Sequence, residues 1–154
     1  MIRAWRILHT RYVDSAFDGE SAYLYGGRWN NPGRRLIYAA GSLALAALEL
    51  LVNGVQPHKV DQFVSISIDF SKEIVQVLEV KSLPSHWAES PAPDETKAIG
   101  DTWLSAGTSA VLQVPSAVIP DESNFLINPL HLNSAKLKTG PARPFSFDRR
   151  LFQT

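Results

Sequence analysis

The spacing of apolar and polar residues along the chain predicts several short strands. Residues 63–70 alternate between a mostly polar set of positions and an apolar set, which is typical of a strand with one buried face. Short apolar or β-branched runs bounded by glycine, proline or asparagine predict the other strands. These runs are residues 2–8, 36–39, 74–80, 110–114 and 125–127, with 117–119 continuing extended and one or two edge strands within 135–152.

Two segments have the end signals of helices. Ser42 is a good N-cap for a helix that ends at Asn53-Gly54, and Asp94 or Thr96 begins a second helix that reaches about Ala106. Residues 14–27 and 82–93 are rich in glycine, serine or proline and are expected to be loops. Because these helices do not alternate strictly with the strands, we predict an α+β fold with mixed sheets, formed by residues 1–154 as a single domain.

Composition narrows the possible functions. Lys+Arg and Asp+Glu are equal at 15 each, so the basic excess that is typical of nucleic-acid binders is absent. The chain contains no cysteine, and the 4 histidines show no metal-binding spacing, so we expect neither a thiolate nucleophile nor a metal. The N-terminus has no apolar signal core and residues 43–52 are too short to span a bilayer, which predicts a cytoplasmic protein.

Glu49 is the most informative single residue. It is the only charge in a helix that is apolar nearly all round, and such a helix should be buried on most of its surface. Burying a carboxylate is costly unless it is paired, hydrogen-bonded or protonated, and proteins often use such a group. The alternative is that Glu49 lies on a narrow solvent-exposed stripe.

Three further residues are candidates for a site. Arg28 follows Gly26-Gly27 and could bind a phosphate, or it could be an exposed arginine after a turn. Tyr38 could stack on a flat ring or be a core tyrosine. Ser116 could face a cleft at a strand end or make a local turn hydrogen bond. Asn124 and residues 128–131 could shape a pocket wall or form a capped turn.

Taken in order, these segments resemble the RES domain family, which is named for an Arg, a Glu and a Ser. The name-giving positions fall on Arg28, Glu49 and Ser116, and Tyr38 falls on the family's tyrosine. The resemblance covers essentially the whole chain. Its segments are 26–30, 37–39, 47–49, 115–117 and 124–129.

The resemblance implies a fold similar to ADP-ribosyltransferases of the diphtheria-toxin kind and a bacterial toxin that consumes NAD⁺. It also implies a cognate Xre-like helix-turn-helix antitoxin and a homodimer. On this basis Glu49 stabilises the oxocarbenium-like transition state as nicotinamide leaves, and Arg28 holds the pyrophosphate. Tyr38 stacks on nicotinamide, and Ser116 hydrogen-bonds the nicotinamide side or the adjacent ribose.

The sequence leaves the acceptor open. Water, inorganic phosphate and a protein side chain share the same first step, so NAD⁺ hydrolysis, NAD⁺ phosphorolysis and ADP-ribosylation of a specific cellular protein all stay possible outcomes. A non-catalytic module that only binds a partner is a further alternative, and it predicts no loss of NAD⁺.

Overall fold

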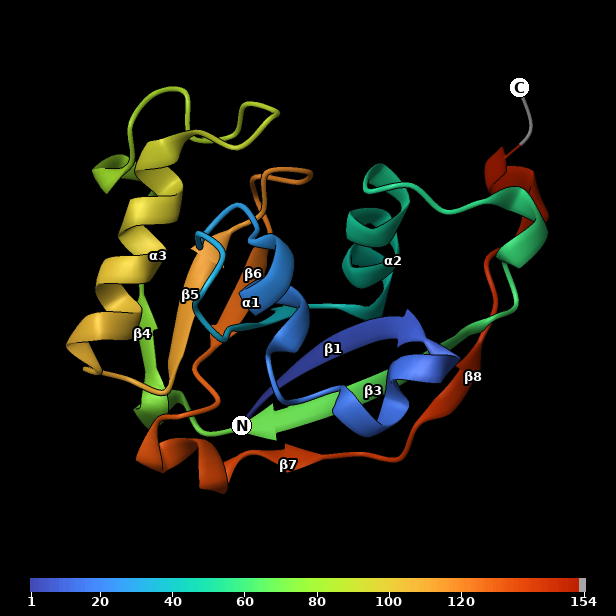
Figure 1. Cartoon of the computed structure of the whole chain (residues 1–154), viewed down its shortest axis with the longest axis horizontal. Coiled ribbons are helices and arrows are strands. Elements are labelled where there is room, and N and C mark those ends of the chain that lie inside the picture. The colour runs from blue at the N-terminus through green and yellow to red at the C-terminus, as the bar shows by residue number, and fades with distance from the viewer. Residues whose placement is uncertain (153–154) are drawn as a thin grey trace.

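The computed structural model describes residues 1–152, in which the strands form one sheet of eight (Figure 1). The strands are β1 (Ile2–His9), β2 (Ile37–Ala40), β3 (Phe63–Phe70), β4 (Val75–Val77), β5 (Val111–Pro115), β6 (Ser123–Ile127), β7 (Lys138–Thr139) and β8 (Arg143–Phe145). Their order is β4-β5-β6-β2-β1-β3-β7, and β8 also pairs with β3. All of these pairings are antiparallel except the parallel pair of β4 and β5.

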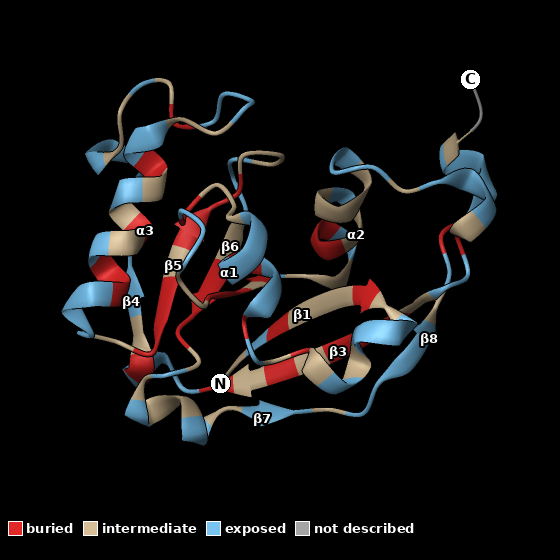
Figure 2. Ribbon diagram, viewed as in Figure 1, coloured by how far each residue is buried: buried red, intermediate tan, exposed pale blue. Residues whose placement is uncertain are grey.

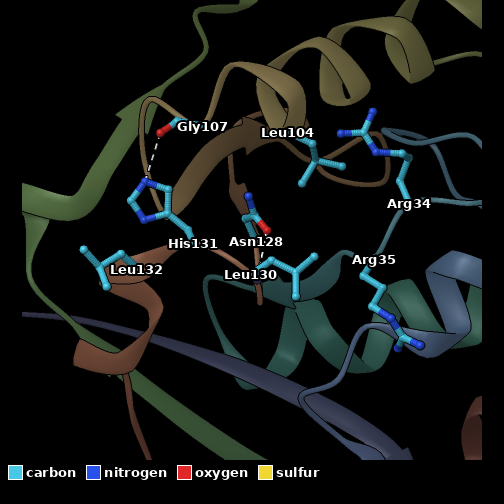
Figure 3. A pocket seen from close by; sticks show the side chains of 8 residues that line it. All are labelled: Arg34, Arg35, Leu104, Gly107, Asn128, Leu130, His131 and Leu132. Atoms are coloured by element: carbon cyan, nitrogen blue, oxygen red, sulfur yellow. Dashed lines mark hydrogen bonds between the residues drawn. The ribbon is translucent and has the colours of Figure 1, made fainter.

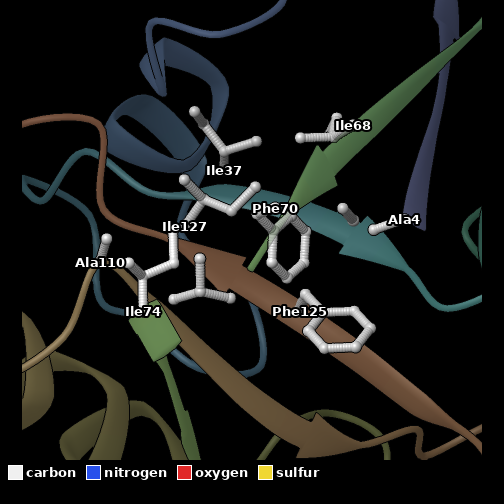
Figure 4. Packing of buried hydrophobic residues seen from close by; sticks show 10 residues of the cluster. Ala4, Ile37, Ile68, Phe70, Ile74, Ala110, Phe125 and Ile127 are labelled. Carbon is white, nitrogen blue, oxygen red and sulfur yellow. The ribbon is translucent and has the colours of Figure 1, made fainter. Parts of the chain in front are cut away.

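The sheet is divided into two halves at the junction of β1 and β2. Only Trp5 and Ala40 are paired there, whereas β1 is paired with β3 along its whole length from Ile2 to His9. The principal core lies between the two halves. It combines side chains of β1 and β3 with side chains of β2, β5 and β6 (Figure 4), among them Ala4, Ile68, Phe70, Ile37, Ala39, Val111, Phe125 and Ile127.

Within residues 1–152 the chain forms three α-helices beside the sheet: α1 (Glu20–Tyr25), α2 (Leu43–Val52) and α3 (Asp94–Ala106). Helix α3 covers the second face of β5 and β6, and its buried residues alternate with exposed ones along the helix (Figure 2). Gly100 lets α3 pack closely against the backbone at Trp29, because a Cβ atom at position 100 would lie 1.6 Å from the Trp29 backbone oxygen. No helix within residues 1–152 is long and apolar enough to cross a membrane.

Most of the predicted elements are confirmed. Ser42 caps α2 by accepting a hydrogen bond from the Leu45 amide, and Gly54 follows the helix with a φ of 97°. Helix α3 ends at Gly107, which has a φ of 62°. The tail supplies two short edge strands, β7 and β8, and the mixture of strands and helices is α+β as predicted.

Three local predictions are wrong. Residues 14–27 are not only loop, since α1 lies between two glycines of positive φ, Gly19 and Gly26. The strand expected over 74–80 is limited to β4, because 3-10 turns flank it on both sides. Residues 117–119 bend instead of continuing extended, because the Ser116 hydroxyl accepts hydrogen bonds from the amides of residues 118 and 119.

The burial of α2 also differs from the prediction. Leu45 and Ala46 are buried against Trp5, Ile7 and Ala40, but Leu48 and Val52 are 37% and 63% exposed. The helix is therefore covered on one side only, although its sequence is apolar nearly all round.

Candidate functional site

The Glu49 carboxylate lies in a hydrogen-bonded group assembled from three distant parts of the chain. Its Oε1 accepts from the Ser116 hydroxyl at 2.7 Å and from the Asn124 side-chain amide at 2.8 Å. The pairing of Pro115 with Ser123 brings the end of β5 beside the start of β6, and α2 begins directly after the neighbouring strand β2. We call Glu49, Ser116 and Asn124 the carboxylate cluster.

Only one oxygen of the Glu49 carboxylate accepts hydrogen bonds from residues 1–152. Glu49 Oε2 accepts no hydrogen bond from residues 1–152, and it is not among the buried polar atoms that lack a partner, so it reaches solvent. The side chain is half-buried. A carboxylate with one anchored oxygen and one open oxygen is held in a fixed orientation and can face a developing positive charge.

Ser116 is fully buried, and its hydroxyl already forms every hydrogen bond that a hydroxyl can form. It donates to Glu49 and accepts from the amides of Val118 and Ile119, both at 3.1 Å. Because a hydroxyl has one hydrogen and two acceptor lone pairs, no further hydrogen bond is available. The local turn bond and the contact to the site, which the sequence offered as alternatives, are therefore both present.

Asn124 is the member of this cluster that the sequence offered only as a possible pocket wall or capped turn, and not as a partner of Glu49. Its Nδ2 donates to Glu49, while its Oδ1 is buried without a partner in residues 1–152. Buried unpartnered amide oxygens are uncommon in native structures. No local sequence signal reveals this contact, because it depends on strand register: Asn124 lies opposite Ala40, two residues before Ser42, the N-cap of α2.

A second polar group surrounds Tyr38. Its hydroxyl donates to Asn30 Oδ1 at 2.6 Å and accepts from the Trp29 amide at 3.1 Å. Gly27 allows the close approach of the ring, because a Cβ there would lie 2.6 Å from the tyrosine oxygen. Burial raises the pKa of the Tyr38 phenol above its ordinary value. We call Tyr38, Asn30 and the backbone of 27–29 the tyrosine cluster.

Arg28 connects the tyrosine cluster to the loop before α3. Its Nη1 donates to the carbonyl oxygens of Trp87 and Glu89 at 3.0 and 2.7 Å, and its own carbonyl accepts from the Thr96 hydroxyl at 2.7 Å. Within residues 1–152 its Nε and Nη2 donate no hydrogen bond, and they are not among the buried polar atoms that lack a partner. That edge of the guanidinium is open to an anion.

Arg6 is a polar residue that the sequence prediction missed. Its Nη1 donates to the Tyr38 carbonyl oxygen at 2.6 Å, and its Nε is buried with no partner in residues 1–152. Burial lowers the pKa of Arg6 to about 10, which leaves it charged at neutral pH. The signal in the sequence is its position between Ala4 and Leu8, which share its face of β1 and are both buried.

The two clusters lie on one face of the sheet. Tyr38 is paired with Leu126 and Ala40 with Asn124, so Tyr38 and Asn124 are diagonal neighbours on adjacent antiparallel strands. Such neighbours lie roughly 7–8 Å apart. The structure thus brings Glu49 and Ser116 into direct contact and fixes Arg28 beside the tyrosine cluster. Within residues 1–152, no hydrogen bond joins Arg28 or Tyr38 to Glu49.

Comparison with known proteins now assigns the family. The sequence pattern that defines the RES domain matches residues 3–148. The chain belongs to the RES domain toxin family. The resemblance seen in the sequence is therefore confirmed.

Relatives are similar over nearly their whole lengths. The chain is 38% identical over 149 residues to the "Toxin Res" of Photorhabdus laumondii, covering 96% of this chain and 95% of that protein. It is 34% identical over 157 residues to the "Prs ADP-ribosylating toxin" of a Sphingobium species, covering 97% and 96% of the two chains. The RES-family chain and these toxins are therefore similar over nearly all of their lengths.

A solved structure confirms the fold. The chain matches one in the crystal structure of the M. tuberculosis MbcT–MbcA toxin–antitoxin complex with a TM-score of 0.77, covering 98% of this chain and 86% of that one. The sequence identity is 17%, so this likeness concerns the fold alone.

Proposed function

We propose that this RES-family chain is an enzyme that cleaves the nicotinamide–ribose bond of NAD⁺ and acts as the toxin of a toxin–antitoxin pair. The observation that carries the proposal is the Glu49 carboxylate, which has one oxygen anchored by Ser116 and Asn124 and the other open to solvent. The relatives that are named toxins support the biological role.

The chemistry follows from this carboxylate. When the bond between the ribose C1′ and the ring nitrogen breaks, the electron pair leaves with nicotinamide and positive charge develops on the ribose. A preorganised carboxylate stabilises that charge without reorienting during the reaction. An acceptor oxygen then bonds to C1′ and releases a proton. Glu49 acts through Oε2, while Oε1 stays bound to its two donors.

The remaining residues bind and position. Arg28 contacts the pyrophosphate through its open Nε and Nη2 edge, which suits a bidentate contact. Tyr38 contributes its ring face to nicotinamide, since its hydroxyl is committed to Asn30. Ser116 is a positioning residue for Glu49 in this proposal, because its buried and fully used hydroxyl leaves none of its hydrogen-bonding capacity for the substrate.

ADP-ribosylation of a protein is a second candidate for the overall reaction. It shares the first step and differs only in the acceptor, which would be a protein side chain instead of water or inorganic phosphate. The 34% identity to a toxin named as ADP-ribosylating favours keeping it beside NAD⁺ degradation.

The likeness to a chain from a toxin–antitoxin complex supports an antitoxin partner. We propose an Xre-like antitoxin with a helix-turn-helix for this chain, and a homodimer of the toxin within the complex. These assignments derive from the family and not from a contact surface in the structure.

The decisive experiment measures NAD⁺ and its products by liquid chromatography after incubation with the purified chain. We expect wild type to consume NAD⁺ and Glu49→Gln to lose at least about 10³-fold in turnover, because only the charge is removed. The amide oxygen of glutamine can still accept from Ser116 and Asn124, so the fold should be retained.

Glu122→Gln is the matched control, since Glu122 is exposed and its backbone oxygen contacts the same Ser116. Full activity in Glu49→Gln would remove this carboxylate from the mechanism. Intact NAD⁺ with wild type, both alone and with cell extract, would favour the non-catalytic binding module. Label transferred from NAD⁺ to one protein band of the extract would select ADP-ribosylation.

A further inference from the structure

A cavity of about 390 Å³ lies at the opposite end of β6 from Glu49 (Figure 3). Asn124 belongs to the carboxylate cluster, whereas Asn128, four positions further along the extended chain, lines this cavity. That separation is about 13 Å along a strand. No residue that lines the cavity belongs to the proposed NAD⁺ site. Its lining residues are Arg34, Arg35, Leu104, Gly107, Asn128, Leu130, His131 and Leu132.

Two leucines at this cavity are exposed to an unusual degree. Leu130 is 79% exposed and Leu132 is 88% exposed. Single exposed apolar residues are common, but these two line one concave surface together with Leu104, with Leu132 at its edge (Figure 3). Apolar side chains that gather around a concavity are typical of a binding surface.

The turn that carries the leucines is held in place by its own side chains. Asn128 Oδ1 accepts from the Leu130 amide at 3.0 Å, and His131 Nδ1 accepts from the Asn133 amide at 3.0 Å. Since Nδ1 accepts, Nε2 carries the hydrogen of the neutral ring, and it lies 3.0 Å from the Gly107 carbonyl oxygen. A turn fixed on both sides loses little freedom on binding a ligand.

Arg34 and Arg35 bring positive charge to the cavity, and no carboxylate of residues 1–152 pairs with it. Arg34 Nη1 donates to the Ser105 hydroxyl and Arg35 Nη1 to the Asp18 carbonyl oxygen, and both acceptors are neutral. Among residues 1–152 neither guanidinium forms an ion pair with a carboxylate. The Arg35 guanidinium also lies 5.2 Å from the centre of the exposed Tyr23 ring. In Figure 3 both arginines lie on one side of the cavity and Leu132 on the other.

We propose that this surface binds an acidic peptide segment of a protein partner, with apolar side chains between its carboxylates. The carboxylates would pair with Arg34 and Arg35, and an apolar side chain would cover Leu104, Leu130 and Leu132. Complementarity of charge and of apolar area argues for this occupant, because an inorganic anion would leave both exposed leucines uncovered. The proposal does not depend on NAD⁺ cleavage.

The test is a fluorescence anisotropy titration of the full purified chain with a capped, labelled octapeptide of alternating glutamate and leucine. We expect saturable binding that weakens about tenfold or more in Arg34→Glu and in Leu132→Ser, and that weakens as NaCl rises from about 0.05 to 0.5 M. Val80→Ser, at an exposed apolar position elsewhere, and Arg149→Glu should bind like wild type. NAD⁺ turnover should not change in Leu132→Ser.

Three results would overturn the proposal. The first is no saturable binding at peptide concentrations up to about 1 mM, which corresponds to negligible affinity. The second is equal binding by wild type and both surface variants. The third is self-association of the chain in sedimentation experiments that Leu132→Ser abolishes, which would assign the surface to a second copy.

Discussion

The carboxylate cluster and the tyrosine cluster share one face of the sheet, but they differ in how many of their polar atoms have hydrogen-bond partners. In the tyrosine cluster the Tyr38 hydroxyl both donates and accepts, and the backbone around it is packed against α3 at Gly100. In the carboxylate cluster, Glu49 leaves one oxygen open and Asn124 leaves its Oδ1 without a partner. The first group is closed by its own contacts, whereas the second keeps the solvent-facing Oε2 of Glu49 for a ligand.

Because of this difference, we expect one cluster to contribute mainly to the stability of the fold and the other mainly to turnover. Changes in the tyrosine cluster should mainly alter the free energy of unfolding, because they break satisfied buried contacts. Changes in the carboxylate cluster should mainly alter turnover, because they act on a group whose interactions are incomplete without substrate. Two polar groups of similar composition can thus have different roles.

Gly100→Ala should have the largest effect on stability. The new Cβ would lie 1.6 Å from the Trp29 oxygen, so α3 must move away from the backbone that supports Tyr38. We expect a loss of about 3 kcal/mol in the free energy of unfolding, as for severe overpacking, measured by urea denaturation. Helix propensity alone would favour alanine by about 1 kcal/mol, so any loss reports on packing.

Ala98→Gly, at an exposed position of the same helix, calibrates that propensity. It should cost about 1 kcal/mol. If Gly100→Ala were as stable as wild type, the close contact between α3 and the Trp29 backbone would not exist, and the tyrosine cluster would not be closed in the way described.

Asn124→Ala should affect turnover more than stability. Glu49 Oε1 would retain Ser116 and lose its second donor, so the carboxylate would be oriented less firmly. We expect kcat for NAD⁺ cleavage to fall about 10- to 100-fold with a small change in KM, measured by steady-state kinetics.

Asn53→Ala provides the matched comparison. Asn53 Nδ2 donates to the backbone oxygen of Glu49 at 3.0 Å and does not contact the carboxylate. It should leave kcat unchanged. An equal loss in both variants would mean that Asn124 acts through the general integrity of α2 and not through Glu49.

The sequence predicted the parts of the site that local patterns encode. Ser42 and Gly54 identify α2, and with it the position of Glu49, because capping chemistry is local. The same reasoning overestimated the burial of α2, since an apolar helix reveals nothing about which neighbour covers it. Arg28 and Ser116 were candidates from the residues alone, and the resemblance to the RES family then gave each an expected role, although neither lies in a specific motif.

Contacts between distant residues were out of reach of these patterns. Asn124 meets Glu49 across 75 positions, and the pairing depends on the register of β6 against β2. Arg6 satisfies the Tyr38 carbonyl only because β1 and β2 diverge after a single pair. Neither fact follows from periodicity, because the first depends on the register between two strands and the second on how the sheet divides into two halves.

Tyr38→Phe should have the smallest effect, and it tests the closed cluster most directly. At pH 7 the variant leaves the Trp29 amide and Asn30 Oδ1 without their partner, which should cost about 1–2 kcal/mol in the free energy of unfolding. Tyr25→Phe, at a 79% exposed position, should cost nothing measurable.

The difference in free energy of unfolding between wild type and Tyr38→Phe should depend on pH, and this dependence distinguishes a buried phenol from a solvated one. Because burial raises the pKa of folded Tyr38 above the ordinary 10.0, the unfolded chain loses the phenolic proton first as pH rises. The stability due to Tyr38 is therefore present below pH 10 and declines above it, by up to about 1.4 kcal/mol per pH unit. Phenylalanine has no such proton, so the advantage of wild type measured at pH 7 should vanish near pH 11 in parallel urea titrations. A constant difference between the two proteins from pH 7 to 11 would place the Tyr38 hydroxyl in water and not in a closed cluster.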